Sequence, residues 1–407
     1  MAFSTKRFFY CLFSLLFLSR GLVWSAEFSP LYTYTPDSVV SLNKNAQVTI
    51  GGEVMTDVTW RDAEEGVDKR VEMRRANVRI VADFVPGVRA FFKLDLTDHE
   101  KQRKRRLLEE AMLVMDSVGG LPGLGFFAGQ GRAPYGQDVT LGIIQSYHHN
   151  ANEVETPEGR VNIIDPPGDS FISPARNNQR LVLPPMRPGQ IDRVVMGGIA
   201  YTWDERLKLE AAVYDPDETQ ENLRLSHPGR HDSNIGFAAR LWWRPTENLT
   251  VQGSVVNSHS STMGDGAGRS DLAGLYAVPA RKNAWAMSVG FDWRDGPWRF
   301  FGEFQQAWDW NHTKNYDVTI AQLGAAREFR DNWRLGAMAE YMRIDDSNIA
   351  RHEDSYYKGV INLKYAFTEE IYVLVEYGYE NMVRRSHAQD RSSRHGNFLG
   401  MRFGFIF

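Results

Sequence analysis

The chain of 407 residues has a single cysteine, Cys11, which lies in the N-terminal segment before residue 27. Disulfide bonds and thiol chemistry are therefore excluded from the rest of the chain. Beyond this segment there is no apolar run of the ~20 residues that a membrane-spanning helix needs. The mean hydropathy of −0.41 also argues against a helical membrane protein. These absences leave a soluble protein or a membrane protein built from strands.

The N-terminus has the pattern of a secretory signal peptide. Lys6 and Arg7 precede an apolar run at 8–18, and small residues follow at Ser25 and Ala26. This order predicts removal of residues 1–26 during export. Removal takes away three of the 47 basic residues and none of the 51 acidic ones, which leaves a net charge of −7. A negative balance argues against nucleic acid as the partner.

Apolar residues recur at every second position in many segments. The clearest is 397–407, where one face carries Leu399, Met401, Phe403, Phe405 and Phe407. This face suits a strand of about 9–11 residues that crosses a bilayer as part of a barrel. An inner strand of a soluble sheet is the alternative. A strand ending in phenylalanine also resembles the assembly signal of bacterial outer-membrane barrels, so we expect Phe407 to contact the barrel-assembly machinery.

About 16 such segments follow one another, and the spacers between them are alternately short and long. We expect short turns at 85–87, 117–123, 204–206, 245–248, 294–297, 330–332 and 368–370. Long connections are expected at 61–71, 97–107, 133–192, 215–233, 258–283, 310–317, 344–357 and 382–395. This asymmetry predicts an all-β fold, a transmembrane antiparallel β-barrel over 47–407 with short periplasmic turns and long outer loops. Residues 27–46 are then an N-terminal periplasmic extension.

Aromatic residues lie beside the expected short turns. Examples are Trp203, Trp243, Trp293, Trp298 and Trp333. Amphipathic rings at one end of each hairpin would form a girdle at the membrane interface. A soluble sandwich is the alternative, but it has no reason to collect tryptophans at one end of every hairpin.

The positions between the apolar ones carry charged residues on nearly every expected strand. Isolated buried ions cost several kcal/mol each, so these residues must be paired or hydrated. A water-filled lumen hydrates them. The candidate cations of the pore wall are Arg75, Arg79, Arg89, Lys93, Arg240, Arg299 and Arg334.

The connection 133–192 is far longer than an ordinary loop and is rich in proline and apolar residues. A disordered loop would not need these apolar groups, so we expect it to fold back into the barrel and narrow it. The candidate constriction residues are Arg132, Arg160, Arg176, Arg180 and Arg187. Guanidinium groups stay charged and suit the passage of anions. Acidic residues such as Asp138 and Glu153 leave open that these arginines are paired and the pore is weakly selective.

Two short motifs lie at the ends of expected strands. Residues 74–79 read Arg-Arg-Ala-Asn-Val-Arg, and residues 129–136 read Gly-Gln-Gly-Arg-Ala-Pro-Tyr-Gly. Both resemble segments of the phosphate-selective porin O/P family, in which the second ends the fifth strand and enters the third loop. The resemblance implies a 16-stranded trimeric channel with a constricting third loop and places Arg75 and Arg79 in an arginine ladder. The family's phosphate specialists also have a lysine cluster, and no lysine lies between 105 and 207.

A basic run is expected in the second outer loop. Its members are Lys101, Arg103, Lys104, Arg105 and Arg106. This run forms an outer vestibule that gathers anions or binds lipopolysaccharide phosphates, unless it is simply a solvated loop. His148 and His149 have no third ligand at a convincing spacing, so no metal is predicted. No Gly-x-Ser-x-Gly nucleophile elbow occurs.

These features predict an outer-membrane porin, a passive diffusion channel for small hydrophilic solutes with a mild preference for anions such as phosphate or carboxylates. We expect no cofactor and no catalysis, a homotrimer, and contact with outer-membrane lipids and lipopolysaccharide. The alternatives are an outer-membrane barrel enzyme resembling a phospholipase, or a plugged structural or adhesive barrel.

Overall fold

The computed structural model describes part of the chain, and 17 strands account for most of that part. The described residues are 39–43, 46–63, 66–85, 87–96, 108–116, 118, 121–131, 133–136, 194–203, 206–214, 235–259, 283–309, 316–329, 332–346, 352–368, 370–385 and 392–407. Within these ranges no helix has the length and apolar character needed to cross a membrane.

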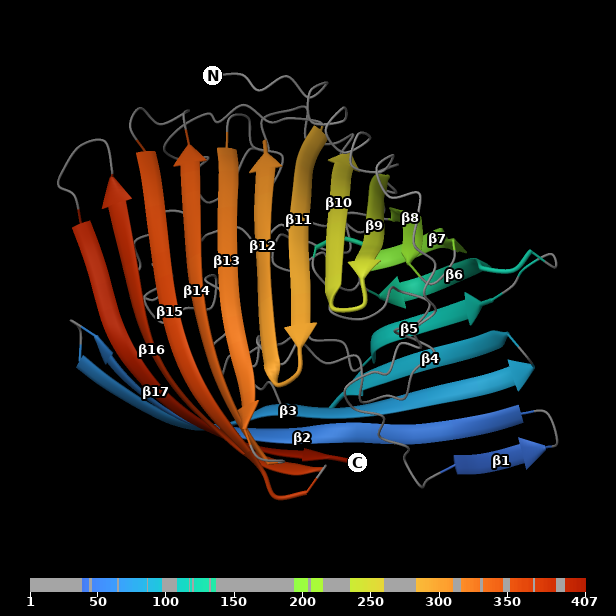
Figure 1. Cartoon of the computed structure of the whole chain (residues 1–407), viewed down its shortest axis with the longest axis horizontal. Helices are drawn as coiled ribbons and strands as arrows, with labels where there is room; N and C mark the ends of the chain where they lie inside the picture. The colour runs from blue at the N-terminus through green and yellow to red at the C-terminus, as the bar shows by residue number, and fades with distance from the viewer. Residues whose placement is uncertain are drawn as a thin grey trace, which may run out of the picture.

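The strands follow one another along the chain and are labelled in Figure 1. The first nine are β1 (Val39–Asn43), β2 (Ala46–Ala63), β3 (Gly66–Val85), β4 (Val88–Asp95), β5 (Leu108–Met115), β6 (Leu124–Gly131), β7 (Val194–Trp203), β8 (Leu207–Tyr214) and β9 (Gly236–Thr246). The others are β10 (Leu249–His259), β11 (Asn283–Asp295), β12 (Trp298–Trp308), β13 (Tyr316–Phe329), β14 (Trp333–Asp346), β15 (His352–Ala366), β16 (Ile371–Arg385) and β17 (Ser392–Ile406).

Strands β2 to β17 form a closed antiparallel barrel. Each pairs with the next in chain order, and β17 pairs with β2 from Gly396 opposite Ala63 to Ile406 opposite Glu53. The last residue continues this seam, because Phe407 and Gly52 exchange two backbone hydrogen bonds of 2.9 and 2.7 Å. Figure 1 shows β17 lying beside β2. The predicted all-β barrel of about 16 strands is confirmed.

Strand β1 is additional to the barrel. It pairs with residues 46–49 of β2, just beyond the stretch that pairs with β17. Since β3 occupies the other edge of β2 at this level, β1 continues the edge that β17 leaves. Part of the expected extension 27–46 is therefore ordered as a strand that covers an otherwise open sheet edge.

Alternation along the strands separates an exposed apolar face from an enclosed face. On the exposed face, Leu335, Ile361 and Phe403 keep 46%, 56% and 47% of their surface accessible. On the other face, Arg240 and Glu376 are buried. In a closed barrel, alternate side chains of each strand point outward and inward, so residues at every second position share one face. Among the described residues, apolar positions predicted to face outward are exposed, and charged positions predicted to face inward, such as Arg240 and Glu376, are enclosed.

Aromatic residues form bands at both ends of the outward face. Near the short turns, Trp333 packs against Tyr365 at 4.6 Å between ring centroids. Near the long connections, Tyr341 packs against Tyr357 at 5.0 Å. On β12 the outward Trp298 and Trp308 are ten residues apart, about 33 Å along the strand and ~25 Å along the axis of a tilted barrel. This spacing matches the apolar band of an outer-membrane barrel.

The short turns agree with prediction, but three expected long connections are wrong. Strands β2 and β3 leave only residues 64–65 between them, where a connection at 61–71 was expected. Likewise, the connection expected at 344–357 comprises only residues 347–351, and the one expected at 382–395 comprises only residues 386–391. Charged residues suggested loops in these segments. The backbone ladder is indifferent to side-chain polarity, however, so polar strands continue beyond the apolar band.

The enclosed face is more mixed than the sequence suggested. Besides the charged positions it carries buried apolar side chains, including Phe91, Phe127, Val256 and Ile320. The barrel interior along β3 to β14 is therefore partly an apolar core rather than a uniformly polar surface.

Candidate permeation pathway

The enclosed face of β3, β4 and β5 holds three charged residues in one register row. Arg79 lies directly opposite Lys93, and Lys93 lies directly opposite Glu110. Each is only 1% exposed. The structure thus brings two of the predicted wall cations together on neighbouring strands. A third, Arg89, faces and hydrogen-bonds Asp83 near the turn between β3 and β4.

Arg240 forms a buried ion pair farther along the wall, between β8 and β9. Its guanidinium donates from Nε to Glu210 at 2.9 Å, and a second nitrogen lies 2.7 Å from the same carboxylate oxygen. The residues are directly opposite each other on β8 and β9, and both side chains are 2% exposed. The guanidinium also lies over the ring of Trp242, 5.0 Å from its centroid. Arg240 is therefore held rigidly on the wall.

The start of the third connection contacts this part of the wall. The backbone N–H of Gly136 donates to the Ser254 hydroxyl at 2.9 Å, and Arg240 donates to the Gly136 carbonyl at 3.4 Å. Ala133 and Tyr135 are buried beside it, at 5% and 4% exposure. The four residues Ala133–Gly136 thus leave β6 and reach β9 and β10 on the enclosed face.

Tyr135 has an unusual environment. Its hydroxyl oxygen is buried and makes no hydrogen bond among the described residues. Burial, and secondarily the negative charge of Glu303, raise the pKa of the Tyr135 phenol well above its ordinary value. Glu303 accepts a 2.6 Å hydrogen bond from Ser288, which in turn accepts one of 3.0 Å from Gln252. A polar belt on β10 to β12 therefore faces the segment.

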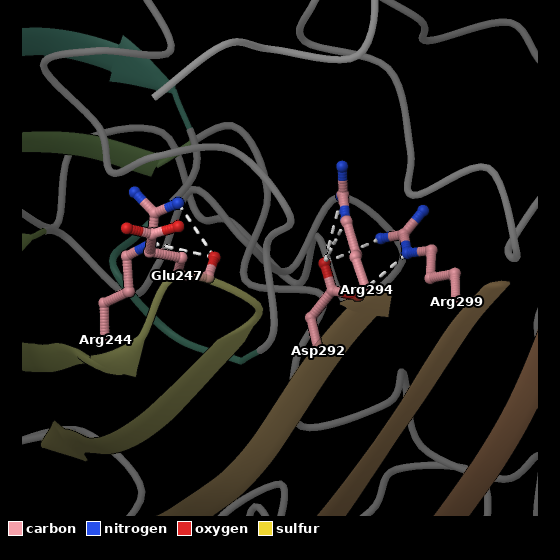
Figure 2. A network of polar contacts seen from close by, with 5 residues as sticks. All are labelled: Arg244, Glu247, Asp292, Arg294 and Arg299. Atoms are coloured by element: carbon pink, nitrogen blue, oxygen red, sulfur yellow. Dashed lines mark hydrogen bonds and ion pairs between the residues drawn. The ribbon is translucent and has the colours of Figure 1, made fainter. Parts of the chain in front are cut away.

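A second network lies near the turn between β11 and β12 (Figure 2). Asp292 accepts hydrogen bonds from two guanidinium groups, at 2.9 and 3.1 Å from Arg299 and at 3.2 and 3.0 Å from Arg294. Nearby on β9, Arg244 donates twice to the backbone carbonyl of Glu247. Both guanidinium groups thus bind the same carboxylate, that of Asp292.

The seam between β2 and β17 carries a buried ion pair. Arg402 binds Asp57 in a bidentate manner, at 2.8 and 2.9 Å. In the same register row, Arg334 lies opposite Lys364 on β14 and β15, both on the enclosed face. The enclosed wall is therefore lined by charges of both signs, many of them paired.

Many predicted site residues cannot be placed. The constriction candidates Arg132, Arg160, Arg176, Arg180 and Arg187 lie outside the described residues, as do the vestibule residues Lys101, Arg103, Lys104, Arg105 and Arg106. For Arg75 only the backbone is described, opposite Met55 on β2. Their roles stay predictions.

Sequence reasoning missed Arg244, Arg294 and Ser254 as pathway residues. The two arginines lie at inward positions within three residues of a short turn. Their place in the alternation of apolar and polar residues could have identified them as inward. Ser254 was not distinguishable, because its role depends on the distant Gly136. Among the residues that the structure describes, no group of three or more His, Cys, Asp or Glu side chains is placed to hold a metal ion.

Solved structures with a similar fold include an outer membrane channel, an outer membrane protein and a porin. The outer membrane channel DcaP of Acinetobacter baumannii is 13% identical, with a TM-score of 0.59 over 89% of this chain and 98% of that one. The trimer form of OmpT of Vibrio cholerae is 12% identical, with a TM-score of 0.56 over 89% and 100%. An anion-selective porin from Comamonas acidovorans is 10% identical, with a TM-score of 0.56 over 88% and 100%.

No family model matches the chain, and no curated protein matches it. The identities to solved structures are low, so the likeness establishes a porin-like 16-strand barrel. That architecture, with its apolar outer face, indicates the bacterial outer membrane.

Proposed function

We propose that the chain is a passive diffusion channel of the outer membrane that admits small hydrophilic solutes. The observation that carries this proposal is the charged enclosed face of a closed barrel. Arg79, Lys93, Glu210 and Arg299 occupy that face while the outward positions between them are apolar. Ionic side chains at inward positions on most of the strands favour a lumen that contains water and solute.

Anion preference is part of the proposal. Support comes from the inward arginines near the short turns, Arg294 and Arg299, which gather at Asp292. Guanidinium groups stay charged and hydrogen-bond carboxylate or phosphate in a planar fork. The third connection, 133–192, would narrow the channel with Arg176, Arg180 and Arg187, and the resemblance to the phosphate-selective porin O/P family makes phosphate a candidate solute.

Orientation and assembly follow from the same proposal. The short turns would face the periplasm, residues 1–26 would be the removed signal and residues 27–46 the periplasmic extension. We infer a homotrimer, supported by the trimer form of OmpT of Vibrio cholerae. The basic run at 101–106 would face outward and attract anions or lipopolysaccharide phosphates.

The test is a planar-bilayer recording of the purified protein in a KCl gradient. Stable conductance steps with a reversal potential of the anion-selective sign are expected. Replacement of Arg176, Arg180 and Arg187 together by Ala should shift the reversal potential toward cations, whereas Arg343→Ala should not. Arg343 is a suitable control because it is exposed and bound to Asp345 near a long connection.

Each outcome separates the proposal from a rival. Absence of conductance would favour a plugged barrel or an outer-membrane enzyme. Conductance with cation preference would retain the channel and remove the anion preference. An unchanged reversal potential in the triple variant would remove the three arginines from the narrow zone.

A further inference from the structure

The segment Ala133–Gly136 is fixed at both ends by described residues. It follows Gly131, the last residue of β6, and it ends at Gly136 on Ser254 of β10. The register between neighbouring strands relates β6 to β10. The residues that lie directly opposite one another on these five strands are Gly125, Ala200, Glu210, Arg240 and Ser254. From this register, the distance from Gly131 on β6 to Ser254 on β10 can be worked out.

That distance is too long for a path along the wall. Four strand spacings of about 4.8 Å separate β6 from β10, and Gly131 lies six residues beyond Gly125, about 20 Å along the strand. The path over the sheet is therefore ~27 Å. Five Cα steps span at most ~18 Å, and the Ser254 side chain with its hydrogen bond adds ~5 Å. The segment must leave the wall and cut across the enclosed space.

Local features of the chain suit this crossing. Pro134 has no N–H to leave unsatisfied, and Tyr135 donates its N–H to the Ala133 carbonyl at 2.7 Å, which makes a tight three-residue turn. Gly136 has φ of 77°, a conformation that favours glycine. The inward residues of β7 and β8 include the small Ala200 and Ala212, which project little from the wall.

We propose that Ser254 and Arg240 are positioning residues that seat Ala133–Gly136 across the lumen, so that this segment forms a fixed part of the constriction. The inference rests on the proposed channel function and deepens it. Ser254 accepts a hydrogen bond from the Gly136 N–H, while Glu210 and Trp242 fix Arg240 so that its Nη1 donates to the Gly136 carbonyl. We call Ser254 and Arg240 the seat of the segment. Replacement of either residue shifts the equilibrium toward an undocked state, in which Gly136 no longer contacts the wall.

The size of that shift follows from the buried hydrogen bond. An unsatisfied buried N–H costs about 1–3 kcal/mol. At 1.4 kcal/mol for each factor of ten, Ser254→Ala should raise the undocked fraction by about 5- to 100-fold. Ser254→Thr retains the hydroxyl and should restore docking.

Ser288→Ala is the matched control. Ser288 is directly opposite Ser254 on β11, is also buried, and binds Gln252 and Glu303 rather than Gly136. Its loss removes buried hydrogen bonds of the wall but leaves both hydrogen bonds to Gly136 in place. A merely structural role for Ser254 would make the two serine variants alike.

The experiment combines hydrogen exchange with conductance on the full-length exported protein. Mass spectrometry should show faster exchange at the amides of Tyr135 and Gly136 in Ser254→Ala, by about tenfold, with wild-type rates in Ser254→Thr and Ser288→Ala. Single channels of Ser254→Ala should show larger or fluctuating conductance, while those of the other two variants match wild type.

Two results would overturn the inference. Equal exchange at these amides in Ser254→Ala and wild type would show that the seat does not hold the segment. Faster exchange with unchanged conductance and noise would show that the segment does not form part of the constriction. A wild-type protein that conducts nothing would instead overturn the proposed function, although the exchange measurement would still report on the seat. Unchanged far-UV circular dichroism in each variant confirms a folded barrel.

Discussion

Asp57→Asn should destabilise the barrel at its closing seam. Asp57 is fully buried and binds Arg402 of the last strand through two hydrogen bonds of 2.8 and 2.9 Å. The two residues are separated by 345 positions in the chain, so this contact forms only when the barrel closes. Asparagine keeps the shape but leaves the Arg402 charge without its counter-ion.

The expected loss follows from the cost of an uncompensated buried charge. Removal of one partner from a buried ion pair costs about 3–5 kcal/mol. Arg402→Gln should cost a similar amount, because it leaves the carboxylate of Asp57 buried alone. The double variant should lose clearly less than the two single losses added together, since both charges have then been removed.

The assay is equilibrium unfolding by urea in lipid vesicles, followed by tryptophan fluorescence. The control is Asp345→Asn, which disrupts an exposed ion pair of 3.3 Å with Arg343 and should cost no more than about 1 kcal/mol. Equal losses for Asp57→Asn and Asp345→Asn, or strictly additive losses in the double variant, would refute the reasoning.

Three further predictions concern packing, titration and selectivity. Gly52→Ala should prevent stable closure, because a Cβ there would overlap the Asn77 carbonyl oxygen and the Phe407 ring, as measured by urea unfolding. Tyr135→Phe should remove one phenol that titrates above the ordinary tyrosine range, as measured by absorbance at 295 nm. In the wild type, the stability that the neutral Tyr135 phenol contributes is fully present below the ordinary tyrosine pKa. That stability is lost as the pH rises through the raised pKa of Tyr135. Asp292→Asn should increase anion preference, measured as a reversal potential, because two guanidinium groups lose their shared carboxylate.

Controls for these variants come from the same chain. Gly253→Ala should be tolerated, because nothing lies within 4 Å of a Cβ at that position. Equal damage from both glycine variants would contradict the packing argument. Asp345→Asn should leave the reversal potential unchanged, and an equal shift in both aspartate variants would contradict the selectivity argument. An identical alkaline titration of wild type and Tyr135→Phe would contradict the third prediction.

The barrel could be predicted because its cause is local. A period of two residues, turn residues at hairpin ends and flanking tryptophans are all readable along a short stretch such as Ile361–Phe367. Strand ends beyond the apolar band could not be predicted, because β2 and β3 continue through charged residues such as Asp62 and Lys69, where only the backbone ladder sustains the strand.

The pathway was less predictable because its contacts join distant segments. Inward cations such as Arg240 and Arg299 were identified from their position in the alternation along the strand. Their ion-pair partners could not be identified, because these depend on the register between neighbouring strands. The seat of Gly136 on Ser254 links residues 118 positions apart and has no local pattern. The buried apolar residues of the inner face, such as Phe127, were likewise hidden, because alternation alone does not show which inner positions are covered.

The most direct test of the account is oxygen accessibility measured by spin labels along β14 in lipid bilayers. The chain has no cysteine after residue 26, so in protein that lacks residues 1–26 single cysteines can be labelled at each position from 335 to 340. We predict that collision with oxygen is high at 335, 337 and 339, which face the acyl chains, and low at 336, 338 and 340. The opposite phase, or no period of two, would contradict the assignment of the apolar face to lipid and the charged face to the lumen.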